Sequence, residues 1–238
     1  MKAFLYGIWL QWKLDLRNKG ILLKYYVVPL VFFGFMGGIF TSITPDTKGS
    51  LIQSMSIFGI TMGAIIGTPI SISETYGTEL KKSYQIGNIP MLIPIINNFI
   101  SAFVHLFIMS TIIYFVAPIA FNASIPKNTT MYFIMLAIFI VTSLSIGCIL
   151  GLTIKTTSKL TMVSQLIFLP SLMLSGIIFP TKMLPKHFAA VGKIFPATWS
   201  FEMMKENNMN LNLLMPLFII IIICTCICIL RIRQLRID

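Results

Sequence analysis

Six stretches of mostly apolar residues divide the chain, and each is long enough to be a membrane-spanning helix. They cover about residues 22–43, 51–72, 93–116, 131–154, 161–179 and 211–230. An α-helix needs about 20 consecutive, mainly apolar residues to cross the hydrocarbon core of a bilayer. The fifth stretch contains Pro170, which removes a helix hydrogen bond and is expected to kink or break that span. The pattern therefore predicts an all-α protein with six transmembrane helices.

The segment before the first span has a different pattern. Its apolar residues recur at helical spacing, and they are Phe4, Leu5, Ile8, Trp9 and Trp12. Charged residues are crowded directly after them. Such a helix lies in the membrane interface, with tryptophan rings at the level of the headgroups. We predict an amphipathic interfacial helix over residues 1–20, and an extension of the first span is the alternative.

Composition and charge place this bundle in a membrane and orient it. The 238 residues are 56% hydrophobic and 11% charged, whereas soluble domains contain about a quarter charged residues. Soluble enzyme folds are therefore largely excluded. Of the 18 Lys and Arg residues, twelve fall on the side of the predicted bundle that holds both termini. Because basic residues favour the inner face, we predict cytoplasmic termini. Residues 1–238 are expected to form one membrane domain, with the six-span bundle over 21–230 and a cytoplasmic tail over 231–238.

Small residues at intervals of four predict close packing between helices. One set lies in the second span and the other in the fourth: Gly59, Gly63, Gly67, Ser143, Gly147 and Gly151. At this spacing the small side chains share one helix face, where a second helix backbone can approach closely. We expect these residues to serve helix packing.

Groups that could carry catalysis are sparse. All seven acidic residues lie outside the predicted spans, so His105 in the third span is expected to pack without a buried carboxylate beside it. Cys224, Cys226 and Cys228 alternate along a helix, where positions two apart point about 200° apart and cannot converge on a metal. The sequence also has no phosphate-binding glycine loop. We therefore expect no catalytic residue, metal or cofactor in this chain, and any ATP-driven work must draw on another subunit.

Two loops stand out from the apolar background, and the first follows the second span. It begins near Glu74, and its remaining candidate residues are Gly77, Thr78, Glu79, Lys81 and Lys82. Thr78 suits the N-cap of a short helix, with an acid in the first turn and lysines further along. A helix of this kind between two spans can dock onto a cytosolic partner, or it can be a simple connector.

The second loop follows the fifth span on the outer side. It is too apolar for a free loop and is interrupted by prolines, and its marked residues are Ser175, Gly176, Pro180, Pro185, Pro196, Thr198 and Glu202. Irregular backbone at membrane depth requires shelter by protein. We predict a short interfacial or re-entrant helix over residues 187–195.

Together these loops resemble the permease subunit of type-2 ATP-binding-cassette exporters. The outer-segment residues, preceded by Leu174, match the family's pattern, as do Glu74, Gly77 and Thr78 in the inner loop. Pro90 lies further from Thr78 than the family's usual proline does. The resemblance implies a homodimer or heterodimer of permeases in the lipid bilayer, bound to two cytosolic ATPase subunits that carry ATP and Mg. It also implies that the loop over residues 73–89 couples those ATPases to the spans, and that substrate passes where spans one, two and five meet their partners.

Few charged residues in the spans suit a hydrophobic or amphipathic cargo, and no nucleic acid is expected as a partner. We therefore expect export of a peptide, toxin, antimicrobial or drug. The frequent Lys, Asn and Ile with only four Arg favour the plasma membrane of a bacterium. One alternative is an ion-gradient-driven secondary transporter, which needs Glu74 or His105 to titrate. The other is a non-transporting immunity or assembly scaffold.

Overall fold

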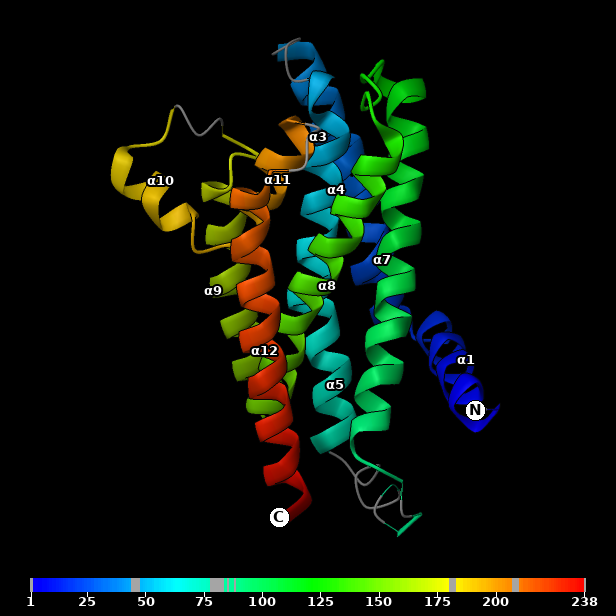
Figure 1. The fold of residues 1–238 in the computed structure, drawn as a ribbon. Helices are drawn as coiled ribbons and strands as arrows, with labels where there is room; N and C mark the ends of the chain where they lie inside the picture. The colour runs from blue at the N-terminus through cyan, green and yellow to red at the C-terminus, as the bar shows by residue number, and fades with distance from the viewer. Residues whose placement is uncertain are drawn as a thin grey trace.

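The described part of the chain is a bundle of long helices (Figure 1). A computed structural model describes residues 2–43, 48–77, 84, 86–87, 89–179, 183–206 and 210–237. Over these ranges it contains helices and turns and no strand, which confirms the predicted all-α class. The helices, with two π-helical turns named η, are α1 Lys2–Arg17, α2 Lys19–Leu22, η1 Leu23–Val27, α3 Val28–Ile43, α4 Leu51–Met62, η3 Gly63–Gly67, α5 Thr68–Gly77, α7 Leu92–Phe121, α8 Thr129–Thr153, α9 Thr157–Leu174, α10 Lys186–Gly192, α11 Pro196–Glu206 and α12 Leu211–Ile237.

Polar residues at the ends of the helices set their boundaries. Asn18 precedes α2, and its side chain accepts hydrogen bonds from the backbone N–H groups of Gly20 and Ile21. Asn128 precedes α8 and accepts a bond of 3.0 Å from the N–H of Met131. Asn122 ends α7 in the left-handed conformation, with φ of 51°. Asn18 and Asn128 thus cap free N–H groups at helix starts, and Asn122 stops α7 at its C-terminus; short polar side chains favour both positions.

Five continuous helical stretches of the described chain are long and apolar enough to cross a membrane. They are Lys19–Ser42, Leu51–Tyr76, Leu92–Phe121, Thr129–Thr153 and Leu211–Gln234. They correspond to predicted spans one to four and six, which confirms five of the six as candidate spans.

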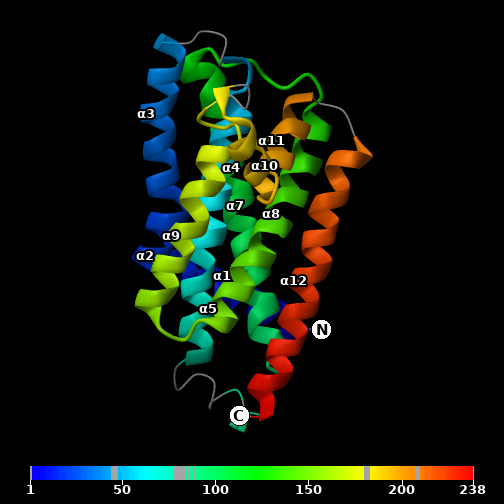
Figure 2. The same cartoon turned by 90° about the vertical axis from the view of Figure 1, so that its left-hand side faces the viewer.

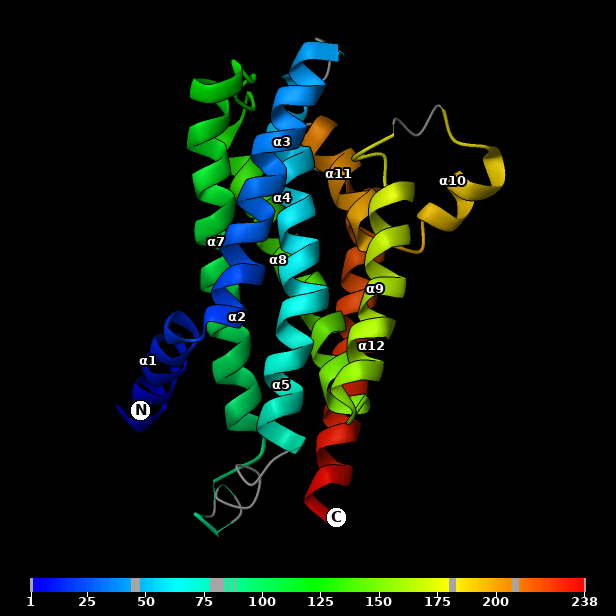
Figure 3. The ribbon, with the colours of Figure 1, turned by 180° about the vertical axis from the view of Figure 1, so that it is seen from behind.

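Helix α9 takes the place of the fifth predicted span and differs from the expectation. It starts with the polar residues Thr157, Ser158 and Lys159 and ends at Leu174, so that residues 175–179 form turns rather than the end of a span. Pro170 lies inside α9 without breaking it. In Figures 2 and 3, α9 runs alongside the bundle. Because α9 is short and begins with polar residues, its crossing of the membrane stays a prediction.

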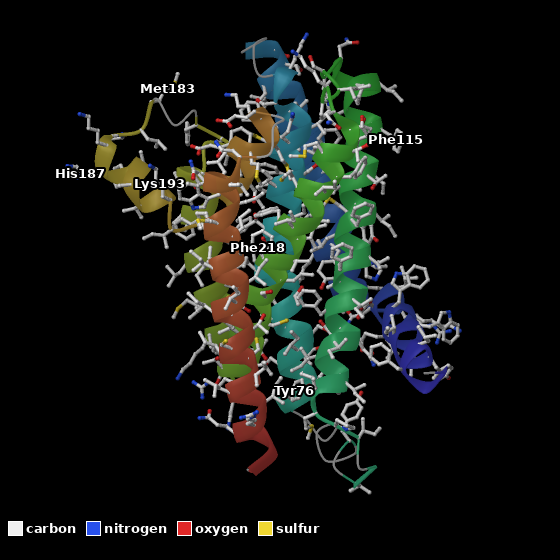
Figure 4. All side chains as sticks on the ribbon, in the orientation of Figure 1. Tyr76, Phe115, Met183, His187, Lys193 and Phe218 are labelled. Carbon is white, nitrogen blue, oxygen red and sulfur yellow. The ribbon has the colours of Figure 1, made fainter. Side chains whose placement is uncertain are left out.

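The second span forms the centre of the bundle. Of its apolar window 83% is buried, against 17% for the span in α12. The outward faces of the surrounding helices carry apolar side chains, as Phe115 of α7 and Phe218 of α12 illustrate in Figure 4. An apolar exterior around a closely packed centre is what a bilayer requires of a helical protein.

The two ends of the bundle hold different elements. The N- and C-termini and the end of α5 lie toward one end, while α10 and α11 lie toward the other (Figure 1). Helix α12 continues to Ile237, so residues 231–237 extend the last helix beyond its apolar part, and their position in the cytoplasm stays a prediction. Helix α10 confirms a short helix in the outer segment, although its depth in a membrane stays a prediction. Helix α11 was not predicted.

Candidate functional site

The inner loop that was predicted to couple the spans to a partner starts at the end of α5. Glu74 lies near the end of this helix, and an electrostatic attraction links it to Lys24 of η1. Gly77 is the last residue of α5. Thr78, Glu79, Lys81 and Lys82 lie outside the described residues.

Three hydrogen bonds brace α5 against its neighbours on the way to that loop. The Asn98 Nδ2 of α7 donates to the Ser71 Oγ at 2.6 Å. Ser73 Oγ donates to the Ile154 carbonyl, directly after α8, at 3.4 Å. The Tyr76 hydroxyl donates to the carbonyl of Met91, the residue before α7, and Figure 4 places Tyr76 at this end of the bundle. These bonds tie α5 to α7, to the residue before α7 and to the residue that follows α8.

The outer-segment residues gather where α9, α10 and α11 meet. Gly176 has a φ of 88°, a left-handed conformation that glycine adopts without steric cost, and it turns the chain directly after α9. Ser175 Oγ donates to the Leu172 carbonyl at 3.0 Å. Thr198 Oγ1 of α11 donates to the Gly192 carbonyl at the end of α10, at 2.6 Å. A Cβ atom on Gly192 would collide with the Leu174 carbonyl, so the last turn of α10 packs directly on the end of α9.

The prolines and the acid of this segment have simpler positions. Pro185 is the residue that precedes α10, and Pro196 opens α11, where its fixed φ and missing N–H suit a helix start. Glu202 is a half-buried residue of α11. Pro180 lies outside the described residues. The described members of the motif therefore shape the connection between α9 and α11.

The glycines of the second span receive side chains from two neighbours. A Cβ atom on Gly59 would lie 2.5 Å from the Met109 Cε of α7, and one on Gly63 would collide with Leu106 of α7. A Cβ on Gly67 would lie 2.7 Å from the Tyr25 Cε1 of η1. This groove is thus filled within the chain, by α7 and η1.

The glycines of the fourth span face the second span. A Cβ atom on Gly147 would collide with the Ala64 carbonyl of η3, and one on Gly151 would lie 2.7 Å from the Pro69 carbonyl of α5. Backbone-to-backbone approach of this kind is what small residues permit in membrane helices. The second span is therefore held between α8 and α7.

A buried carboxylate joins α1 to α7, and sequence reasoning did not find it. Asp15 is only 2% exposed. It accepts hydrogen bonds from Ser101 Oγ of α7 at 2.5 Å and from Gln11 Nε2 at 2.9 Å. Burial raises the pKa of Asp15 above its ordinary value, and the two hydrogen bonds oppose that shift. A signal was present in the sequence, because Gly7, Gln11 and Asp15 recur every four residues and so share one face of α1.

His105 lies one helical turn beyond Ser101 in the same interface. Its Nδ1 is 2.8 Å from the Tyr26 hydroxyl, and Trp12 of α1 stacks on its ring with centroids 6.0 Å apart. Its Nε2 finds no hydrogen-bond partner among the described residues. Helix α1 therefore brings a buried carboxylate, Asp15, into the interface that holds His105, although its hydrogen bonds go to Ser101 and Gln11 rather than to His105. Trp12 packs on His105 because this face of α1 contacts α7, and its depth at the headgroups stays a prediction.

The cysteines do not form a metal site in the part of the chain that is described. Cys226 is exposed, whereas Cys224 is buried and Cys228 is half-buried. Cys228 and Cys148 of α8 line a common cavity. The described residues contain no group of three or more His, Cys, Asp or Glu side chains arranged to hold a metal ion.

Comparison with protein-family models gives a match over most of the chain. A family model described as "ABC-2 type transporter" matches residues 2–209, which include α1 to α11. No curated protein matches the chain.

Proposed function

Because the chain belongs to the ABC-2 type transporter family, we propose that it is the membrane subunit of an ATP-driven exporter of hydrophobic or amphipathic cargo. As a family member it is a transmembrane transport component without catalytic activity of its own. ATP and Mg are bound in this proposal by two cytosolic ATPase subunits. The permease itself acts as a homodimer or as a heterodimer with a second permease.

The bracing of α5 is the observation that supports coupling to these ATPases. The helix leads into the loop after Gly77 and is hydrogen-bonded to α7, to the end of α8 and to the start of α7. Glu74 also attracts Lys24 in the first span. An ATPase pair that binds ATP better in its closed arrangement shifts the spans only through a mechanical connection of this sort. We assign that connection to Glu74, Gly77 and the loop that follows.

The proposed topology has six crossings, with α9 as the fifth. An even number of crossings returns both termini to one side, in agreement with their positions toward one end of the bundle (Figure 1). The excess of basic residues on that side favours the cytoplasm. Helix α1 then lies against the inner leaflet, where its exposed Leu5 and Trp9 meet lipid. The membrane is the plasma membrane of a bacterium.

The cargo pathway is assigned to the dimer interface, with the first and fifth spans as its main walls, because the second span is largely buried within one protomer. Helix α9 supports this assignment with a stripe of exposed apolar residues, which are Met162, Leu166, Leu169 and Met173. These positions share one face of the helix. A pathway wall of this composition suits a peptide, toxin, antimicrobial or drug with a large apolar surface.

One observation favours a second function, transport driven by an ion gradient. Asp15 and His105 lie in one buried interface, and buried ionisable groups of membrane proteins often belong to proton or ion pathways. This alternative requires transport by the permease alone.

Copurification separates the two functions. The tagged chain is isolated from its native membrane in mild detergent, and ATP hydrolysis in the eluate is measured with and without amphipathic peptides and dyes. The proposal predicts an associated ATPase whose rate increases with cargo. An eluate that contains no ATPase but transports cargo after reconstitution would favour the ion-driven alternative.

A further inference from the structure

A cavity of about 250 Å³ lies between α9 and the centre of the bundle. Its lining comes from α4, η3, α8, α9 and the connection between α10 and α11, and the apolar members include Ile65, Ile146, Ile167, Ile194 and Phe195. The cavity thus lies inside one copy of the chain, directly beneath the outer segment.

The shape of the cavity follows from uneven packing along α8. At Gly147 the backbone of η3 approaches α8 so closely that a Cβ atom would collide with the Ala64 carbonyl. One turn earlier, at Ser143, the two elements separate, and α9 does not fill the space between them. Ile194 both lines the cavity and is 71% exposed. This residue therefore marks the mouth, at the outer segment.

The residues that line the cavity favour a mainly apolar ligand that has one polar group. Apolar cavities of about 150 Å³ stay dry and bind benzene or xenon, so this larger one has room for a short alkyl chain or an aromatic ring. Ser143 lines it, is 1% exposed, and its hydroxyl makes no hydrogen bond to any residue that the structure describes. Buried hydroxyls in native proteins are usually paired. An unpaired one offers a ligand a single hydrogen bond.

We propose that this cavity binds an alkyl chain or apolar side chain that carries one hydrogen-bonding group. This alkyl group belongs either to exported cargo or to a bilayer lipid, and both present the same chemistry to the site. The role of the cavity in export rests on the proposed function, whereas the binding itself does not. All residues that line the site belong to one protomer.

Photolabelling tests the proposal directly. The purified chain in lipid nanodiscs is irradiated with an octanol that carries a diazirine, and the adducts are located by mass spectrometry. We expect adducts on residues of α8, α9 and the 193–196 connection, displaced by excess octanol. Ile167→Trp fills the cavity from its half-buried edge and should reduce this labelling by at least about tenfold, as the loss of a binding contact of ordinary strength does.

Three matched variants keep the test informative. Ile112→Trp makes the same substitution at an exposed position of α7 that lines a separate, open apolar hollow, and it should leave the labelling of α8, α9 and the 193–196 connection unchanged. Ile194→Ala widens the mouth at an exposed position and should preserve or increase it. Ser143→Ala keeps the space but removes the hydroxyl, and should reduce the preference for octanol over an octane probe. Equal labelling of all lipid-facing helices, or undiminished labelling of Ile167→Trp, would overturn the proposal.

A second labelling experiment identifies whether the bound alkyl group comes from lipid or from cargo. Phosphatidylcholine with a diazirine in its acyl chain replaces the octanol. Adducts in the same peptides support a lipid acyl chain, adducts with octanol alone support cargo, and adducts with neither overturn the proposal. ATPase copurification of Ile167→Trp is measured in parallel. Loss of the ATPase from the wild-type chain would contradict the proposed function, whereas absent labelling with the ATPase retained would contradict only the cavity.

Discussion

Single glycines determine how closely the central helices of this protein approach one another. In Gly63→Leu the new side chain would occupy the space of Leu106 and Tyr25, and overpacking of this kind costs about 1–3 kcal/mol. We expect a lower melting temperature in detergent, measured by differential scanning fluorimetry. Gly34→Leu is the matched control, because no atom lies within 4 Å of its added Cβ. Equal melting temperatures for the two variants would show that the groove of the second span is not filled by α7 and η1.

The buried carboxylate of Asp15 makes the contact between α1 and α7 sensitive to pH. Its folded-state pKa is raised by burial, so the folded protein binds this proton more tightly than the unfolded chain does. Protonated Asp15 therefore contributes to the free energy of unfolding below the ordinary pKa of a carboxyl group. This contribution is lost as the pH rises through the raised pKa of the folded state. We expect the melting temperature of the wild-type chain to fall over that window.

Asp15→Asn is the matching control for this pH dependence. The amide can still accept a hydrogen bond from Ser101 and carries no charge to desolvate, so the difference in melting temperature between wild type and variant should depend on pH in the same window. A difference that stays constant from pH 4 to 8 would mean that Asp15 does not titrate in contact with α7.

At the scale of helices, the sequence predicted what a bilayer imposes and missed what tertiary packing adds. Runs of apolar residues identify spans because lipid cannot satisfy exposed backbone groups, and five predicted spans match candidate spans of the structure. Helix α11 was not predicted because its sequence mixes proline, polar and apolar residues. Its buried side chains, such as Ala197 and Met203, are covered by α8, α12, α4 and α9, which are distant in the sequence or become neighbours only in the fold.

The candidate site was predicted unevenly for the same reason. The outer-segment residues could be found from their local pattern, because Gly176 and Pro196 act on the backbone next to them. Asp15 could not be found from charge alone, since its partner Ser101 is 86 residues away in the sequence. A charged residue near the start of a chain is expected to face water unless the helix that buries it is known.

The proposed topology makes a testable statement about the position of α9 in the membrane. If α9 is the fifth crossing, Lys159 and Lys186 lie on opposite sides of the bilayer. In a background without the four native cysteines, we expect a membrane-impermeant maleimide to label Lys186→Cys in intact cells and Lys159→Cys only after the cells are broken. Labelling of both positions from the same side would show that α9 does not cross.

At the scale of the whole molecule, the end of α5 is the proposed connection to the ATPase. In the double variant Glu74→Ala and Thr78→Ala, loss of the attraction to Lys24 and of the predicted helix cap should weaken the connection. A lost cap costs about 1 kcal/mol, too little to unfold the bundle. We expect normal expression and dimerisation with weaker stimulation of the ATPase and less export. Full export with normal ATPase stimulation would make this loop a simple connector.

The most direct test of the whole account is the energy source of transport. Everted membrane vesicles that contain the chain and its copurifying ATPase are given fluorescent amphipathic peptides, and uptake is followed with and without ATP. The account predicts uptake that requires ATP hydrolysis and continues after an ionophore has collapsed the ion gradients. Uptake that proceeds without ATP and stops when the gradients collapse would contradict it.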